Sequence, residues 1–289
     1  MSTLLFSVVT QSLTFLPLAL GISISYTILR ATDMTLDGSF VLGAAVFARF
    51  STLGMPPIFA AGCALIAGML SGIMVSLIQR GGKVDPLLAG ILATFILASL
   101  NLLIMGMPNI NLLSQTTLFS NAFNNSEFSG WMLVGFSSLV LCGISLFLIS
   151  SRLGLLLHAL GDNPGLLHRL GKNIEIYRMM GFALTNALAA ASGCITAQTV
   201  GYADIGMGLG MTLTGIGAII LGQQLIRLVI KKSAHRTFIE FSACLIGVLF
   251  YFFAMNCLLR FEVNPIYLKM ILGLVLILFL RAAVTRKPA

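Results

Sequence analysis

Charged side chains are scarce in this sequence. Only 9% of its 289 residues are Asp, Glu, Lys or Arg, whereas 58% are hydrophobic and the mean hydropathy is +1.01. A soluble domain carries about 25% charged residues, so this chain has too few polar side chains to coat a water-exposed globule. Apolar runs of the roughly 20 residues that a spanning helix needs recur along it. The composition therefore predicts an all-α, polytopic transmembrane helical bundle.

Motifs for autonomous chemistry are also missing. No nucleotide-binding P-loop pattern occurs, and no loop is long enough to fold as a separate domain. The five cysteines stand singly in or near apolar runs without the spacing of metal ligands, which predicts small buried side chains. We therefore expect no metal and no cofactor. Any energy that this protein uses has to come from an ion gradient or from a partner protein.

The hydropathy pattern predicts about nine spans in a single transmembrane domain that covers residues 1–289. The second span is short and the seventh begins in a Gly-rich segment, so we expect both to be broken or re-entrant. The predicted spans are residues 5–29, 38–52, 57–79, 86–106, 131–150, 177–200, 208–229, 237–258 and 265–283.

Lysine and arginine lie almost entirely on one side of these spans. Fourteen fall on the side that holds residues 151–178, and three fall on the other side, Arg49, Arg260 and Lys269. Because cytoplasmic loops carry the excess of positive charge, we expect 151–178 and the C-terminus in the cytoplasm and the N-terminus outside. The net charge of +8 therefore indicates membrane orientation, and we expect no nucleic-acid partner.

Residues 151–178 form a polar island between two apolar runs. The island holds six of the 26 charged residues (17 basic plus 9 acidic) and two of the three histidines. Asn163 suits an N-cap, Pro164 the first helical position, and Gly171 the left-handed residue that ends a helix. These signals predict a helix of about two turns over 164–170, too short to be stable alone. It would either join two spans at the membrane surface or dock a partner.

The island and four other segments resemble a known family. The segment 154–164, GLLLHALGDNP, continuing to Arg169-Leu170-Gly171, resembles the cytoplasmic coupling loop of binding-protein-dependent ABC importer permeases. The branch is that of branched-chain amino acid and ribose permeases. Similarity to an uncharacterised subgroup with tryptophan or tyrosine uptake members is carried by 32–40, 86–92, 107–113 and 201–210. The resemblance covers about residues 14–280.

The resemblance implies a multi-pass permease of the bacterial inner membrane. It implies a homodimer or pseudo-dimer that forms the path for a small solute, with an aromatic amino acid as the first expectation. A cytoplasmic ATPase would dock on the coupling loop, an extracytoplasmic binding protein would deliver the substrate, and lipid would surround the bundle. The residues expected to couple to the ATPase are Gly161, Asp162, Asn163, Pro164, Leu166, Leu167, Arg169, Leu170 and Gly171.

Two aspartates mark the start of the second span. Asp33 and Asp37 are four residues apart, so they would share a face if both were helical. Acids at membrane depth are costly and tend to be functional. One interpretation is a broken helix whose end lines the translocation path. The other is a pair of helix caps at the cytoplasmic surface beside Arg30, and the residues alone leave both open.

Other polar residues inside apolar runs complete the candidate path. The segment 201–217 contains six glycines, which we expect mostly to allow close helix packing, as at Gly68 and Gly72, with Asp204 near the outer mouth. Asn101 is expected to hydrogen-bond across helices. The candidate path residues are Asp33, Met34, Thr35, Asp37, Asn101, Asp204 and Met207.

Two alternatives belong to other functional classes. Broken spans with buried acids are also typical of secondary transporters driven by an ion gradient. An Asp-x-x-x-Asp pair in a membrane is also found in Mg²⁺-dependent enzymes that act on diphosphates. That chemistry needs a second acidic cluster, and the remaining acids are isolated, so the enzyme interpretation is disfavoured.

Overall fold

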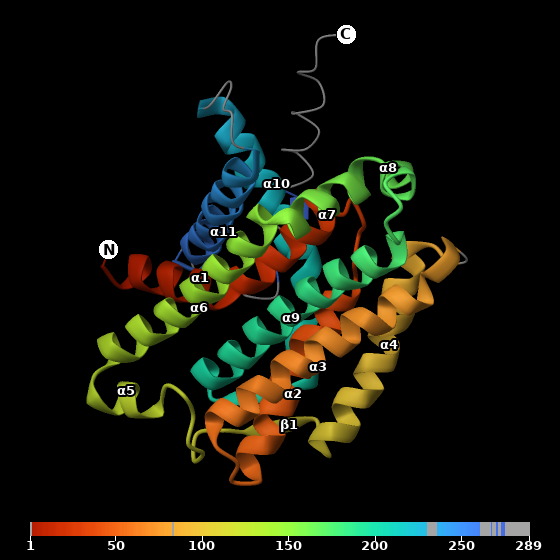
Figure 1. Ribbon diagram of the computed structural model, residues 1–289. Helices are drawn as coiled ribbons and strands as arrows, with labels where there is room; N and C mark the ends of the chain where they lie inside the picture. Colours follow the sequence, from red (N-terminus) through yellow and green to blue (C-terminus); the bar gives the residue numbers. More distant parts are fainter. Residues whose placement is uncertain are drawn as a thin grey trace.

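The computed structural model describes residues 2–82, 84–229 and 236–260, with positions 267, 270, 273 and 274. These residues are mostly helical (Figure 1). Seven of the described helices are long and apolar enough to cross a membrane. They are α1 (Ser2–Ser23), α3 (Pro57–Ile78), α4 (Pro86–Met105), α6 (Glu127–Ser150), α9 (Ile174–Val200), α10 (Met211–Val229) and α11 (Arg236–Arg260).

Two of the nine predicted spans differ from these seven helices. The span predicted over 38–52 is present as α2 (Thr35–Thr52), a less apolar helix most of whose residues are buried between other helices. The span predicted over 265–283 lies outside the described residues, apart from the four isolated positions given above. The described part of the chain therefore contains seven candidate spans and the largely buried helix α2.

Short elements lie at the two ends of the bundle (Figure 1). β1 (Asn109–Asn111) pairs antiparallel with β2 (Tyr202–Asp204), Ile110 opposite Ala203, and this sheet lies at the end farthest from α8. The segment between the spans predicted over 86–106 and 131–150 thus contains β1 and the helix α5. The remaining elements are α5 (Ser120–Asn125), α7 (Arg152–Asp162), α8 (Pro164–Arg169), the π-helix η1 (Ile24–Ile28) and the 3₁₀ turns η2 (Arg80–Gly82) and η3 (Ile205–Gly208).

Two large apolar clusters and two smaller ones fill the interior of the described part of the chain. The larger joins α1, α6, α10 and α11, and includes the buried Leu157 and Leu167 of the polar island. The second joins α2, α3, α4 and the sheet around Phe47 and Met105. Met207 contacts both clusters, which places this candidate path residue at the junction between the two halves of the core.

α9 lies at the centre of the bundle, beside α2 and α3 (Figure 1). The approach of α3 is close because glycines face α9. A Cβ atom at Gly68 would lie 2.5 Å from the Cβ of Ala190, and one at Gly72 would lie 2.1 Å from the carbonyl oxygen of Phe182. The small-residue packing predicted for Gly68 and Gly72 is confirmed, and its partner is α9.

This packing predicts a position-specific loss of stability in α3. Gly72→Val should lower the free energy of unfolding by about 1–3 kcal/mol or more, because the backbone of α9 cannot move aside for the new methyl groups. Gly62→Val is the matched control, since a Cβ at Gly62 meets no atom within 4 Å. Thermal unfolding in detergent, followed by the fluorescence of the single tryptophan, measures both. Equal losses for the two variants would contradict the packing.

Candidate functional site: two interior helix starts and a polar loop

The helix α2 begins inside the protein rather than at its surface. Thr35, its first residue, is fully buried, and so is Asp33, which precedes the helix. The backbone N–H of Thr35 donates to Asp33 Oδ1 at 2.9 Å, so the carboxylate satisfies a backbone donor that no helical carbonyl reaches. Asp33 therefore acts as a cap, as one interpretation held, but it does so in the interior. The two aspartates do not share a helix face, because only Asp37 is helical.

Asp33 is held by a buried chain of polar side chains. Asn186 Nδ2 donates to Asp33 Oδ2 at 2.9 Å, and Ser39 Oγ donates to Asn186 Oδ1 at 2.6 Å. Ser39 Oγ is also 2.7 Å from Ser71 Oγ. The four side chains come from the segment before α2, from α2 itself, from α3 and from α9. One hydrogen-bonded chain therefore joins the three central helices to the interior start of α2.

Asp37 joins the start of α2 to the start of α10. Its carboxylate accepts the backbone N–H of Gly210 at 3.0 Å and that of Thr212 at 2.6 Å. Thr212 Oγ1 donates to the same carboxylate at 2.6 Å. A carboxylate is favourable at a helix N-terminus, where unpaired N–H groups and the helix dipole are both positive. Two helix N-termini thus meet at one acid, and α10 begins three residues later than the span predicted from 208.

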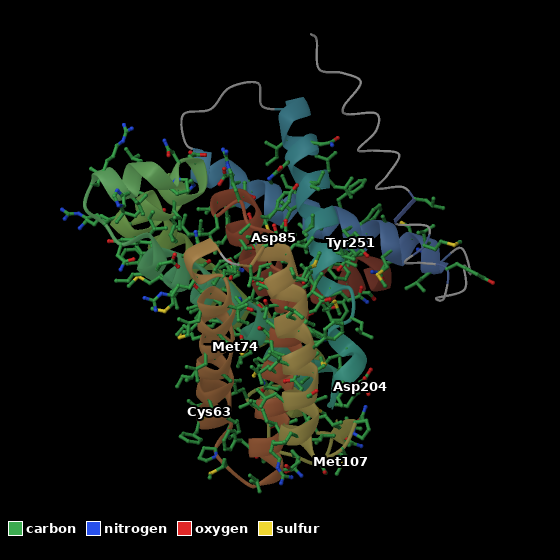
Figure 2. The ribbon with its side chains drawn as sticks, turned by 90° about the vertical axis from the view of Figure 1, so that its right-hand side faces the viewer. Cys63, Met74, Asp85, Met107, Asp204 and Tyr251 are labelled. Atoms are coloured by element: carbon green, nitrogen blue, oxygen red, sulfur yellow. The ribbon has the colours of Figure 1, made fainter. Side chains whose placement is uncertain are left out.

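The remaining path candidates divide between this site and the β1–β2 sheet. Asn101 Nδ2 donates to the carbonyl oxygen of Gly38 at 3.1 Å, which confirms the predicted bond between helices. Asp204 accepts from Gly206 N at 2.7 Å and from Asn109 Nδ2 at 3.2 Å, so it braces the β1–β2 sheet. Figure 2 shows Asp204 near the end of α4 opposite to Asp85. Asp204 is therefore not part of the chain around Asp33.

The helix predicted over 164–170 is confirmed as α8. Asn163 Oδ1 accepts the N–H of Gly165 at 3.0 Å, Pro164 occupies the first turn, and Gly171 has a φ of +66°. Of its three leucines, Leu167 is buried, whereas Leu166 and Leu170 are 45% and 58% exposed. The island also contains α7, which was not predicted. Its last residues, from Ile174 on, already belong to α9.

The end of α7 rests directly on the π-helix η1 that follows α1. A Cβ at Gly161 would lie 1.9 Å from the carbonyl oxygen of Ile28, so the two backbones are in contact. The neighbouring Asp162 pairs with Arg30 at 2.5 Å. Both side chains are about half exposed, so the pair contributes at most about 1 kcal/mol and acts chiefly in orientation. Arg30 has a φ of 51°, an uncommon conformation for a non-glycine residue, and it follows the π-helix η1.

Sequence reasoning missed the partners of the two aspartates. Asn186, Ser39, Ser71 and Thr212 were not candidates, although Asn186 is an amide within an apolar run, the same signal that identified Asn101. Across the described ranges, no group of three or more His, Cys, Asp or Glu side chains is placed to hold a metal ion.

The chain belongs to the family described as branched-chain amino acid transport system / permease component, which matches residues 4–280. An uncharacterised protein of Rickettsia prowazekii (strain Madrid E) is 46% identical over 279 residues, 96% of each chain. The tyrosine transport system permease protein of Clostridioides difficile (strain R20291) is 36% identical over 276 residues, 95% of this chain and 89% of that one. The ribose import permease protein RbsC of Escherichia coli (strain K12) is 22% identical over 228 residues, 75% and 68% of the two chains.

The resemblance seen in the sequence is therefore confirmed. The chain is a permease component of the ABC importer family, a multi-pass protein of the bacterial inner membrane. The family is one of transport proteins, so the enzyme alternative is set aside, and transport driven by an ion gradient is not favoured.

The buried chain predicts strong coupling between Asp33 and Asn186. Asn186→Ala removes the donor to Asp33 Oδ2 and should lower the free energy of unfolding by about 1–3 kcal/mol or more, because a buried acceptor loses its partner. Adding Asp33→Ala to that variant should cost less than Asp33→Ala costs in the native protein. A double-mutant cycle by thermal unfolding measures the difference, expected at about 0.5–3 kcal/mol. Strictly additive losses would show that the two side chains do not interact.

Proposed function

We propose that this chain forms the translocation path of an importer for an amino acid with an aromatic side chain, tyrosine being the first candidate. The observation that carries the proposal is the 36% identity to a tyrosine transport permease over 95% of this chain. The chain has few charged residues to hold a polyanion, which suits a zwitterionic solute. A cytoplasmic ABC ATPase, an extracytoplasmic binding protein, a second copy of this chain and the surrounding lipid are its proposed partners.

The proposed orientation places α8 in the cytoplasm and the β1–β2 sheet outside. The excess of Lys and Arg on the side of the polar island supports it. The N-terminus is then outside and the C-terminus, which lies outside the described residues, is cytoplasmic. In this orientation the ATPase meets Leu166, Arg169 and Leu170, all exposed on α8, while the buried Leu167 anchors the helix. The binding protein docks at the end with α5 and the sheet.

The coupling route in this proposal runs along the segment between α1 and α2. ATPase closure displaces α7 and α8, and Gly161 transmits the displacement to Ile28 through direct backbone contact. Arg30 lies three residues before Asp33, so the movement reaches the buried chain within one short segment. The residues of the loop that act in this step are those predicted from Gly161 to Gly171.

The proposed path passes the interior starts of α2 and α10. Asp37 holds the two N-termini together in this state, so separation of α2 from α10 exposes backbone donors to a passing carboxylate. Asn101 supports a path beside these helix starts. Its Oδ1 is buried and has no hydrogen-bond partner among the described residues, so it is an acceptor that a solute could use. Met34, Thr35 and Met207 flank these groups, and Asp204 lies toward the outer mouth.

Reconstituted uptake tests the proposal. Proteoliposomes that contain this chain, its cognate ATPase and internal ATP, with the binding protein outside, should accumulate L-tyrosine. The chain alone should accumulate none under an imposed proton or sodium gradient. Gradient-driven uptake by the chain alone would overturn the assignment to an ATP-driven importer, and ATP-driven uptake of leucine or ribose but not tyrosine would overturn the substrate.

The two exposed leucines of α8 predict loss of ATPase docking without unfolding. The double change Leu166→Glu and Leu170→Glu should weaken binding of the ATPase subunit by about 10-fold or more, because apolar contact is replaced by charge at the interface. Leu53→Glu is the control, since Leu53 is also 58% exposed but lies beyond the far end of α2. Affinity measurements in detergent, with thermal unfolding alongside, separate docking from stability. Unchanged affinity would place the ATPase elsewhere.

A further inference from the structure

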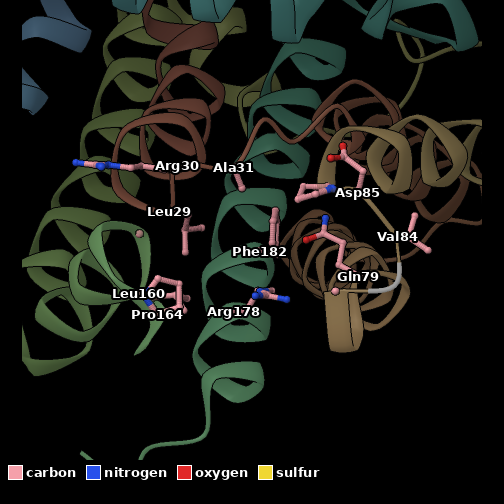
Figure 3. Close-up of a pocket in the computed structure, with 13 residues that line it drawn as sticks. Leu29, Arg30, Ala31, Gln79, Val84, Asp85, Leu160, Pro164, Arg178 and Phe182 are labelled. Carbon is pink, nitrogen blue, oxygen red and sulfur yellow. The ribbon is translucent and has the colours of Figure 1, made fainter. Parts of the chain in front are cut away.

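A cavity of about 490 Å³ separates the cytoplasmic loop from the central helices (Figure 3). The loop supplies one wall. The opposite walls come from α9, from the residue that follows α3 and from the residue that precedes α4. The side chains and backbone that matter here are those of Gly161, Pro164, Arg178, Phe182, Gln79 and Asp85.

Gln79 lines this cavity and carries a buried donor without a partner. Its side chain is only 2% exposed, and its Nε2 has no hydrogen-bond partner in the described part of the chain. A buried donor without a partner costs about 1–3 kcal/mol. Such groups are rare in native proteins, and a turn of this side chain toward an acceptor in the cavity would remove the cost.

Arg178 brings further donors. Its guanidinium is 3.8 Å from Glu175 Oε2, too far for a hydrogen bond, while Glu175 Oε1 accepts the N–H of Gly81 at 3.3 Å. The planar guanidinium is suited to bind a carboxylate through two parallel bonds. The second arginine of the lining, Arg30, is paired with Asp162 and extends away from Arg178 and Gln79 in Figure 3.

Asp85 supplies the opposite charge. It caps α4, since its Oδ1 accepts the N–H of Leu87 at 2.9 Å, and its side chain is otherwise exposed. A carboxylate has acceptor sites for several donors, so one cap bond leaves room for an ammonium group. The lining also contains the apolar side chains of Leu29, Val84 and Phe182. Anion donors, a cation acceptor and an apolar surface therefore share one cavity.

We propose that this cavity binds a free α-amino acid from the cytoplasm. Arg178 and Gln79 hold its carboxylate, Asp85 holds its ammonium group, and its side chain packs on Leu29, Val84 and Phe182. The choice of an amino acid over other zwitterions rests on the proposed function. Because Gly161 and Pro164 form one wall, a bound amino acid opposes movement of the loop toward α3 and α4. The transported product thus slows its own import.

Equilibrium binding of radiolabelled L-tyrosine to the purified chain in lipid nanodiscs, without ATPase or binding protein, tests the site. Arg178→Gln and Gln79→Leu should each weaken binding by about 10-fold or more. Asp85→Asn should weaken tyrosine similarly but leave competition by 3-(4-hydroxyphenyl)propionate unchanged, because asparagine retains the helix cap while losing the charge that pairs with ammonium. Arg80→Gln, an exposed neighbour outside the lining, should bind as the native chain does.

Three outcomes would overturn the proposal. They are the absence of saturable tyrosine binding, equal affinity in the native chain and Arg178→Gln, and competition by sulfate as strong as that by tyrosine, which would indicate a plain anion site.

An uptake assay distinguishes failure of the cavity proposal from failure of the proposed function. In proteoliposomes of the complete transporter, tyrosine loaded inside should slow uptake by the native complex and have little effect on Arg178→Gln, whose initial uptake without internal tyrosine is retained. Tyrosine uptake without binding in the cavity would contradict only the proposed cavity site. Binding in the cavity without ATP-driven tyrosine uptake would contradict only the proposal that tyrosine is the imported substrate.

Discussion

A helix that begins inside a protein leaves its first backbone N–H groups beyond the reach of water, and most of this structure can be traced to that constraint in α2. Asp33 satisfies the first donor, but a buried carboxylate then needs donors of its own. Asn186 is one of them, which requires α9 to lie against the start of α2. Asp37, one turn later, satisfies the start of α10 in turn. The central helices are thus arranged around backbone N–H groups whose hydrogen bonds are accepted by Asp33 and Asp37.

The same interior start links distant parts of the molecule. The segment that carries Asp33 follows α1 and the π-helix η1, and α7 contacts η1 at Ile28 and this segment at Arg30. The β1–β2 sheet at the opposite end leads directly into η3 and the start of α10. Segments from both ends of the bundle therefore lead to neighbouring residues, Asp33 and Asp37, without a long side-chain relay between them. This geometry fits a transporter whose two ends act alternately.

Local chemistry explains which features were predictable. Asn163, Pro164 and Gly171 frame α8 through contacts within a few residues, so the sequence sufficed to predict that helix. The same holds for apolar runs and for the small residues Gly68 and Gly72. The partners of Asp33 and Asp37 on α9 and α10 lie 153 residues or more away, and strands of three residues leave no periodic pattern. Those contacts depend on which helices pack together, and local sequence patterns do not show this.

The glycine contacts between α9 and its neighbours have a mechanical consequence. Where backbones touch without intervening side chains, there is little compressible material, so α2, α3 and α9 move as a single stiff body. α9 has 27 residues and is about 40 Å long at 1.5 Å per residue. A tilt of about 5° pivoted at one end would displace the other by about 3.5 Å over that length. Such a tilt at one end of α9 would thus, by leverage alone, produce a displacement at the other end at least as wide as a water molecule.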